Sequence, residues 1–328
     1  MASNKIAITD LEFDAIKTNL KDYLSAQTTF RDYDFEGSGM DVLLDILAYN
    51  THYMGYYANM IGNEMFMDSA SLRESVVSHA KHLNVIPNSV TAPTAYLNMT
   101  FTPPTSPTSL TIAKDTKFTT SISATSYTFT TTVATTIIPA AGVYSVTNLA
   151  IKEGKILNKS YTADLADTTQ RFIIPNATVD TSTISVTVQN SSSDTTVVSW
   201  ADGNSLDVTT ITSTQKVYFL QEVEAGKFEV YFGDGIIGNA LSDDNIVILT
   251  YVVSNKAAAN GAAVFTNSTA IATVTDVAVA TVSSASAGSE AESLKSIKYN
   301  APLDYASQGR CVTAEDYKLY AKKLFPNA

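Results

Sequence analysis

The sequence is poor in the residues that build disulfide frameworks and metal centres. It holds one cysteine, Cys311, and three histidines among 328 residues. A single cysteine cannot close a disulfide within the chain, so we interpret Cys311 as chemically inert. His79 and His82 stand three residues apart, but neither a cysteine nor an HExxH helix completes a zinc site. We therefore predict no metal centre and interpret the histidines, His52 included, as surface or helix-bundle residues.

Positive charge is also scarce. The 21 basic residues are outnumbered by 32 acidic ones, which gives a net charge of -11 and a pI near 4.7. Such an acidic chain is a poor match for nucleic acid or for an anionic membrane as its main partner. No apolar run reaches the length of a signal peptide near the N-terminus or of a membrane-spanning helix elsewhere. We therefore expect neither export by that route nor membrane insertion.

Motifs that mark an active site or a nucleotide site are missing as well. The most promising stretch, VYFGDGIIGNALSDDNIVILTY at residues 230–251, lacks the lysine and helix of a phosphate loop and does not match a calcium loop. We interpret it as a hairpin turn, in which the glycines permit positive φ angles and Asp234 closes an Asx turn. A weak cation site at residues 243–245 is the open alternative. We predict no catalytic residue, no cofactor and no enzyme activity.

Residues 9–86 show the periodicity of α-helices. A first helix is expected to open with a capping box of Thr9 and Glu12. A third helix is expected to start at Ser71, with Glu74 as its capping partner, and to stop before Pro87. The apolar faces of these two helices are predicted to consist of Phe13, Ile16, Leu20 and Leu24 in the first and Leu72, Val76 and Leu83 in the third.

The helix expected between them, from Met40 to about Met67, carries two apolar stripes. One is a seam with alternating spacings of four and three, as in a coiled coil, and the other lies beside it. A helix that is apolar around more than half of its circumference needs partners on two sides, so we predict that another chain covers part of it. The predicted partner-helix interface is the seam, which consists of Leu43, Leu47, Asn50, Met54, Tyr57 and Ile61. The second stripe consists of Val42, Ile46, Tyr49, Tyr53, Tyr56 and Met60. Asn50 either fixes the register between helices or is an amide without such a role.

From residue 91 to about 285 the pattern changes to that of strands. Alternation of period two and β-branched residues replace the helical spacing, and turn clusters separate short strands. This pattern predicts an antiparallel sandwich or barrel. The expected fold class is α+β multidomain, with an N-terminal helical bundle segment, central antiparallel β-rich domains and short C-terminal helices.

After residue 285 the helical period returns. One helix is expected to open with a capping box of Ser289 and Glu292 and to end at Pro302, and another to open with Thr313 and Asp316. Their apolar faces are predicted to be Leu294 and Ile297 in the first and Tyr317, Tyr320 and Leu324 in the second. Because the sequence stops soon after this helix, we expect a domain that is cut short. The predicted divisions are therefore a helical assembly segment at 1–90, β domains at 91–285 and the helical start of a further domain at 286–328.

Three stretches resemble one protein family. Residues 32–87 look like the N-terminal helical segment of the large wedge protein of contractile-tail bacteriophage baseplates, in the baseplate J-like family. Residues 230–261 resemble the family's FGDG hairpin, and residues 292–326 resemble its NAP, Q, R, VT and DY segment. The matching positions are Phe232, Gly233, Asp234, Gly235, Gly238, Asn300, Ala301, Pro302, Gln308, Arg310, Val312, Thr313, Asp316 and Tyr317.

The resemblance implies a structural scaffold of the virion, located in the tail baseplate and assembled in the bacterial host cytoplasm. It implies as partners a second copy of the chain, other wedge proteins through a helical bundle, and the protein that initiates the tail tube and sheath. It also implies a part in the rearrangement that triggers sheath contraction, and no cofactor. Family members are roughly twice as long as this chain.

Two other classes of function compete with the scaffold. A receptor-binding or glycan-binding β-sandwich of a tail fibre or adhesin would also suit the strands rich in threonine and serine. A tail-borne hydrolase would require a catalytic pair in a concave pocket. The long double-striped helix favours the scaffold, because an adhesin tip needs no helical assembly domain.

Overall fold

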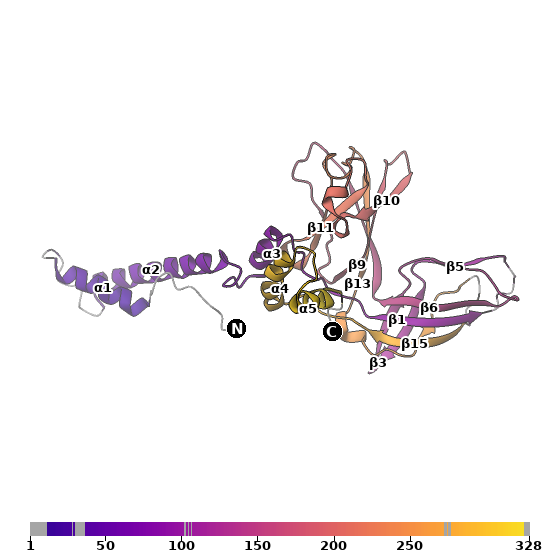
Figure 1. The fold of residues 1–328 in the computed structure, drawn as a ribbon. Coiled ribbons are helices and arrows are strands. Elements are labelled where there is room, and N and C mark those ends of the chain that lie inside the picture. The colour runs from indigo at the N-terminus through magenta and orange to yellow at the C-terminus, as the bar shows by residue number, and fades with distance from the viewer. Residues whose placement is uncertain are drawn as a thin grey trace. The chain divides into compact units, whose positions relative to one another are not determined.

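The computed structural model describes residues 12–27, 29, 37–101, 103, 105, 107–271, 274 and 277–324. The chain divides into two compact units, Met1–Leu83 and Asn84–Ala328 (Figure 1). The α-helices are α1 (Phe13–Ser25), α2 (Gly39–Glu64), α3 (Arg73–His82), α4 (Leu294–Ser307) and α5 (Ala314–Leu324). The short 3-10 helices are η1 (Gly203–Ser205), η2 (Val208–Thr210), η3 (Glu224–Gly226) and η4 (Lys256–Ala259).

In the first unit α1 packs along α2 (Figure 1). As predicted, α1 turns one apolar face inward, where Ile16 is buried. The expected Thr9 cap lies outside the described residues. The register of the pair is set by charge, because Lys17 contacts Asp41 at 3.4 Å and Asp45 at 2.5 Å. Lys21 contacts Asp41 at 3.1 Å, so α1 is fixed against the first turns of α2.

The start of α3 differs from the predicted capping box of Ser71 and Glu74. Helix α3 begins after Leu72, whose side chain makes no capping bond. The cap comes instead from Glu64, the last residue of α2, whose Oε1 accepts from both the backbone N and the Oγ of Ser71 at 2.7 Å. The prediction was wrong because a carboxylate seven residues upstream satisfies these donors, and local spacing does not reveal that turn. Val76 is buried as expected, whereas Leu72 is exposed.

The second unit contains all of the described β-strands, in two large sheets and one small one. The strands are β1 (Thr94–Phe101), β2 (Leu110–Ile112), β3 (Lys117–Ile122), β4 (Thr125–Thr130), β5 (Thr135–Ile137), β6 (Tyr144–Glu153), β7 (Lys155–Thr162), β8 (Phe172–Ile173), β9 (Val179–Gln189), β10 (Val197–Asp202), β11 (Val217–Glu222), β12 (Phe228–Phe232), β13 (Ile246–Val253), β14 (Thr266–Asn267) and β15 (Ala278–Ser286). The six-stranded sheet has the order β14-β3-β4-β6-β1-β15, the seven-stranded sheet β7-β13-β9-β10-β11-β12-β8, and β2 pairs with β5. The α+β multidomain fold class is confirmed.

The seven-stranded sheet is inserted into the chain of the six-stranded sheet. Its strands run from β7 to β13, whereas β1 pairs with the much later β15. Each sheet has its own apolar core: one draws on residues 95–151 and 259–285, the other on residues 174–251. One pair, β10 with β11, is parallel rather than antiparallel as predicted. The reason is that residues 203–216, with η1 and η2, return the chain in a loop instead of a tight hairpin.

Buried carboxylates hold the junction between the two sheets. Glu153 is 1% exposed and accepts hydrogen bonds from the backbone N and side-chain Nδ2 of Asn255, at 2.9 and 2.7 Å. Asp180 is equally buried and accepts from the Ala92 N at 3.0 Å and the Lys152 Nζ at 2.8 Å. A buried carboxylate without such partners would be strongly destabilising. These bonds therefore fix the places where the chain passes from the six-stranded sheet into the inserted sheet and back again.

The C-terminal helices confirm one predicted cap and correct the other. Thr313 and Asp316 form the expected reciprocal capping box: the Asp316 N donates to the Thr313 Oγ1 at 3.2 Å, and the Thr313 N donates to the Asp316 Oδ2 at 2.8 Å. Helix α4, however, is capped by Ser293 rather than Ser289. Ser289 instead forms a β-bridge with Thr91.

Helix α4 also continues past Pro302, where it was predicted to end. A proline inside a helix removes one backbone donor, and here the buried Ile297 and Ala301 hold the turn before Pro302 while the buried Ser307 lies after it. The helix ends instead at Ser307 and is followed by Gln308, whose φ of 46° is left-handed, and by Gly309 with a φ of 75°.

Candidate partner interface

The predicted interface residues of α2 all lie on the surface of this chain. Exposed fractions in the seam range from 52% at Leu47 to 65% at Met54, and Asn50 is exposed as well. The second stripe is exposed too, from 38% at Met60 to 59% at Tyr56. The side of α2 that is buried carries Asp41, Leu44, Ala48, Gly55 and Gly62.

Helical geometry places the two stripes away from α1. At 100° per residue, Leu44 and Ala48 share one face, and the seam and the second stripe are centred about 120° to 140° around the helix from it, one on each side. The salt bridges to α1 also use the buried side, through Asp41. The exposed arc is therefore broad and apolar, with Asn50 as the amide within it. Patches of this kind on a folded protein mark interaction surfaces.

Tyrosines make the exposed arc partly rigid. The Tyr49 and Tyr53 rings meet edge to face at 4.6 Å, and the Tyr49 hydroxyl bonds that of Tyr53 at 3.0 Å. This hydrogen bond raises the pKa of Tyr53. Tyr56 and Tyr57 are also in ring contact, at 5.9 Å. Tyrosine rings that are already ordered lose little side-chain entropy on binding and suit a protein interface.

The FGDG segment is not the hairpin that we predicted. Strand β12 precedes it and β13 follows it, but these two strands are not neighbours in the sheet. The Asx turn is present, since the Asp234 Oδ1 accepts from the backbone N of Ile236 at 2.9 Å and of Ile237 at 3.0 Å. The mistake arose because turn chemistry specifies a local reversal of the chain, whereas the partner of a strand depends on distant residues.

Two of the three glycines in this segment have the predicted positive φ. These are Gly235 at 86° and Gly238 at 80°. Gly233 is needed for another reason, because a Cβ there would lie 2.3 Å from the Ile237 carbonyl oxygen. The segment is therefore built around close backbone contacts.

The alternative of a cation site at residues 243–245 gains no support. The Asp243 Oδ1 accepts from the Leu165 N at 3.0 Å, and the Asn245 Nδ2 donates to the Asn190 O at 2.8 Å. Both side chains thus tie loops together. No cluster of three possible metal ligands occurs among the residues that the structure describes. No described helix is both long and apolar enough to cross a membrane.

The predicted motif residues near the C-terminus lie on α4, on α5 and on the connection between them. Asn300 donates to the Ser296 Oγ at 2.9 Å, while Ala301 is buried. Tyr317 is 62% exposed, which contradicts its predicted burial, and Leu319 takes the buried position instead. Arg310 is exposed. The side chain of Leu324 lies outside the described residues.

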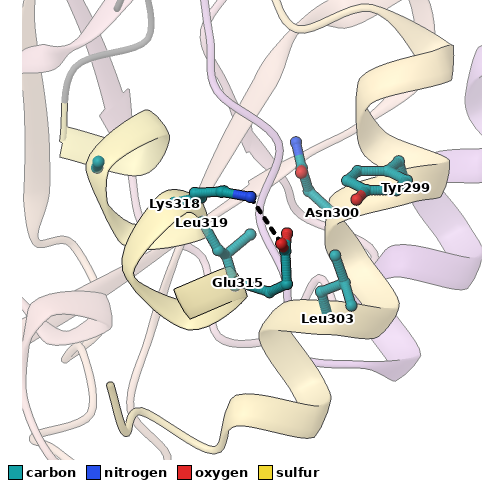
Figure 2. Close-up of a pocket in the computed structure, with 7 residues that line it drawn as sticks. Tyr299, Asn300, Leu303, Glu315, Lys318 and Leu319 are labelled. Atoms are coloured by element: carbon teal, nitrogen blue, oxygen red, sulfur yellow. Dashed lines mark hydrogen bonds and ion pairs between the residues drawn. The ribbon is translucent and has the colours of Figure 1, made fainter. Parts of the chain in front are cut away.

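A hollow of about 380 Å³ lies between α4 and α5 (Figure 2). Leu303 and Leu319 point into it, and Glu315 and Lys318 form an ion pair at 2.7 Å on its rim. This hollow was not predicted from the sequence, because it depends on how the two helices pack. Its rim therefore carries one acidic and one basic side chain, which are paired with each other.

Comparison with known families settles the affiliation. Residues 12–84 match the model described as baseplate wedge protein gp6-like, helical domain. Residues 158–272 match the third domain of bacteriophage baseplate wedge protein gp6, so that the two matches cover more than half of the chain. The chain belongs to the gp6-like baseplate wedge family. The predicted resemblance to the large baseplate wedge protein is thereby confirmed.

Two individual proteins illustrate the similarity. Baseplate wedge protein gp6 of Enterobacteria phage T4 is 28% identical over 341 residues, an alignment that covers 95% of this chain and 50% of the relative. The chain thus spans about half the length of that curated relative. A chain in the cryo-EM structure of the anti-feeding prophage baseplate matches with a TM-score of 0.34 and 12% identity, over 98% of this chain and 66% of that one.

Proposed function

We propose that this protein is a structural subunit of a phage tail baseplate, in which α2 joins helices of partner chains. The observation that carries the proposal is the exposed double stripe of α2, within the region that matches the helical domain of the gp6-like family. The charged side of α2 is occupied by α1, so the apolar arc is the part that is free to bind.

The proposal also covers the partner proteins and the location of this protein. The helical partners are a second copy of this chain and other wedge proteins, and the protein that initiates tube and sheath is a further partner. The assembly forms in the host cytoplasm and is located in the tail of the virion. There it contributes to the ring around the hub and to the rearrangement that precedes sheath contraction. The role is structural rather than catalytic.

The test is co-assembly with the other wedge proteins of the same phage, measured by light scattering after size-exclusion chromatography. Leu47→Asp places a carboxylate in the seam, where burial against a partner without a counter-charge is costly. We expect co-assembly to weaken at least tenfold. Leu47 is 52% exposed, so the isolated chain should fold normally.

Asn19→Asp is the matched control, because it adds the same charge at an exposed position of α1. It should leave co-assembly within twofold of wild type. Unchanged co-assembly of Leu47→Asp would remove the seam from the interface. A wild-type chain that stays monomeric with every wedge protein would instead favour the adhesin, to be followed by a glycan screen.

A further inference from the structure

The FGDG segment forms an ordered loop that the scaffold role of α2 leaves unexplained. Asp234 holds the backbone of Ile236 and Ile237, as described above. The Gly235 N donates to the Gly238 O at 3.1 Å, and the next residue, Asn239, donates its N to the Gln215 O at 2.8 Å. The loop is thus closed on itself and anchored to the segment that leads into β11.

This ordered loop carries two exposed isoleucines. Ile236 is 75% exposed and Ile237 is 43% exposed. A single exposed apolar residue is ordinary on a protein surface, but these two are adjacent and held by backbone hydrogen bonds. A loop that is already ordered loses little conformational entropy on binding. Such a loop therefore presents its apolar side chains in a form suited to docking.

Neighbouring strands extend the apolar surface. Tyr231 on β12 stacks on Phe219 of β11 with ring centroids 5.4 Å apart, and Tyr231 is 42% exposed. Phe219 is held from another side by Gly203, where a Cβ would lie 2.7 Å from the ring. Together with Val208 and Ile237, these rings line a hollow of about 350 Å³. The hollow is large enough for one or two apolar side chains.

The charge around this hollow is negative. Asp234 lines it, and Asp207 directly precedes the lining residue Val208. Hydrogen bonds from the backbone of Ile237 and Ile236 lower the pKa of Asp234, and those from Thr209 lower the pKa of Asp207. No lysine or arginine is among the seven lining residues. The net charge of -11 makes a second copy of this chain a poor match for such a rim.

We infer that this surface, made of the FGDG loop and the Phe219–Tyr231 pair, binds a segment of a different protein that presents an apolar side chain flanked by lysine or arginine. The apolar side chain enters the hollow beside Ile237, and the basic residues lie against Asp207 and Asp234. The inference rests on the proposed function only in taking the other tail proteins as the source of the partner. Its residues belong to the second unit, separate from α2.

The test uses full-length chains that carry a photo-crosslinking benzoylphenylalanine at one position, mixed with the other wedge proteins of the same phage and irradiated. One chain carries the probe in place of Ile236, another in place of Leu47 on α2, and a control in place of Val264, which is 78% exposed in the other β domain. We expect the probe at 236 to label a peptide with an apolar residue next to lysine or arginine. The partner and the labelled residues are identified by mass spectrometry.

The outcomes separate this inference from the proposed function. Labelling from position 47 but not from 236 would overturn the inference and leave the proposed function standing. Labelling of a second copy, or of an acidic segment, from position 236 would also overturn it. An absence of crosslinked partner at both positions would contradict both this inference and the proposed function.

A substitution supplies an independent measurement. Ile237→Asp should weaken binding of the labelled partner at least tenfold, because it removes an apolar contact and places a carboxylate where the partner's apolar side chain would desolvate it. Val264→Asp should change that affinity less than twofold. Equal effects of the two variants would contradict the inference.

Discussion

At the scale of single residues, Glu64 shows how one side chain can join two helices. Its burial raises the pKa, but hydrogen bonds from Ser71, Ser75 and Leu72 outweigh that effect and lower the pKa to about 2. The carboxylate is therefore ionised in the folded protein well below the ordinary pKa of 4.5. The stability that it contributes is present above pH 4.5 and is lost as the pH falls toward 2.

Glu64→Gln should therefore remove this pH dependence. At pH 7 we expect the variant to lose about 1 kcal/mol of α3 stability, the usual effect of a lost helix cap. Hydrogen exchange of the α3 amides between pH 7 and pH 3 measures it. Ser71→Ala combined with Glu64→Gln should cost less than the sum of the single changes, since both remove the same bond. Strict additivity would show that the cap is not the cause.

At the scale of elements, the sequence predicts what is local and fails where pairing is distant. Both stripes of α2 follow from a period of 3.6 residues, so the helical spacing alone places residues such as Leu47 and Met54 on one face. The strand partner of β12 could not be predicted, because it depends on β11 and β8 rather than on the FGDG turn. The predicted cap of α3 was wrong for the same reason, since Glu64, which supplies the observed cap, belongs to another helix. The hollow beside Ile237 likewise needs residues from several segments.

The register of α1 on α2 yields a prediction at this scale. The hydrogen bond from Lys21, with a second from Lys17, lowers the pKa of Asp41. Its contribution is therefore present above the ordinary pKa of 3.8 and is lost on acidification through the lowered value. Asp41→Asn should speed hydrogen exchange throughout α1 at neutral pH.

Asp22→Asn is the control for that change, because Asp22 is exposed on α1 and has no ion pair to α2 among the described contacts. It should leave the exchange of α1 unchanged. If Asp41→Asn also left α1 protected, apolar packing around Ile16 would suffice to hold the helix.

At the scale of the whole molecule, the inserted sheet is the feature that the sequence conceals. Uniform alternation from residue 91 to 285 gives no sign of where one core ends and the next begins. The structure places the ends of the insertion together, since a Cβ on Gly154 would lie 2.3 Å from the Val253 carbonyl oxygen. The two chain segments that connect the sheets are joined there by the hydrogen bonds from Asn255 to Glu153.

Replacing residues 155–253 with two glycines should therefore leave the six-stranded sheet folded. Its core needs only residues 95–151 and 259–285, which the shortened chain keeps. The isolated segment 155–253 should fold as well, with its own core. Cooperative thermal unfolding of each piece, followed by circular dichroism, is the measurement. A shortened chain without a cooperative transition would mean that the two cores depend on each other.

The β structure of the second unit also begins and ends at one place. The Glu292 N donates to the Asn88 O at 2.9 Å, and the Asn88 N donates to the Glu292 Oε2 at 3.1 Å, next to the bridge between Thr91 and Ser289. A mechanical load applied along the chain, from the N-terminal helices to α4, therefore acts first across these few bonds. While they hold, force passes from one helical part to the other without stretching either sheet. The intervening β domains would then be spared the tension.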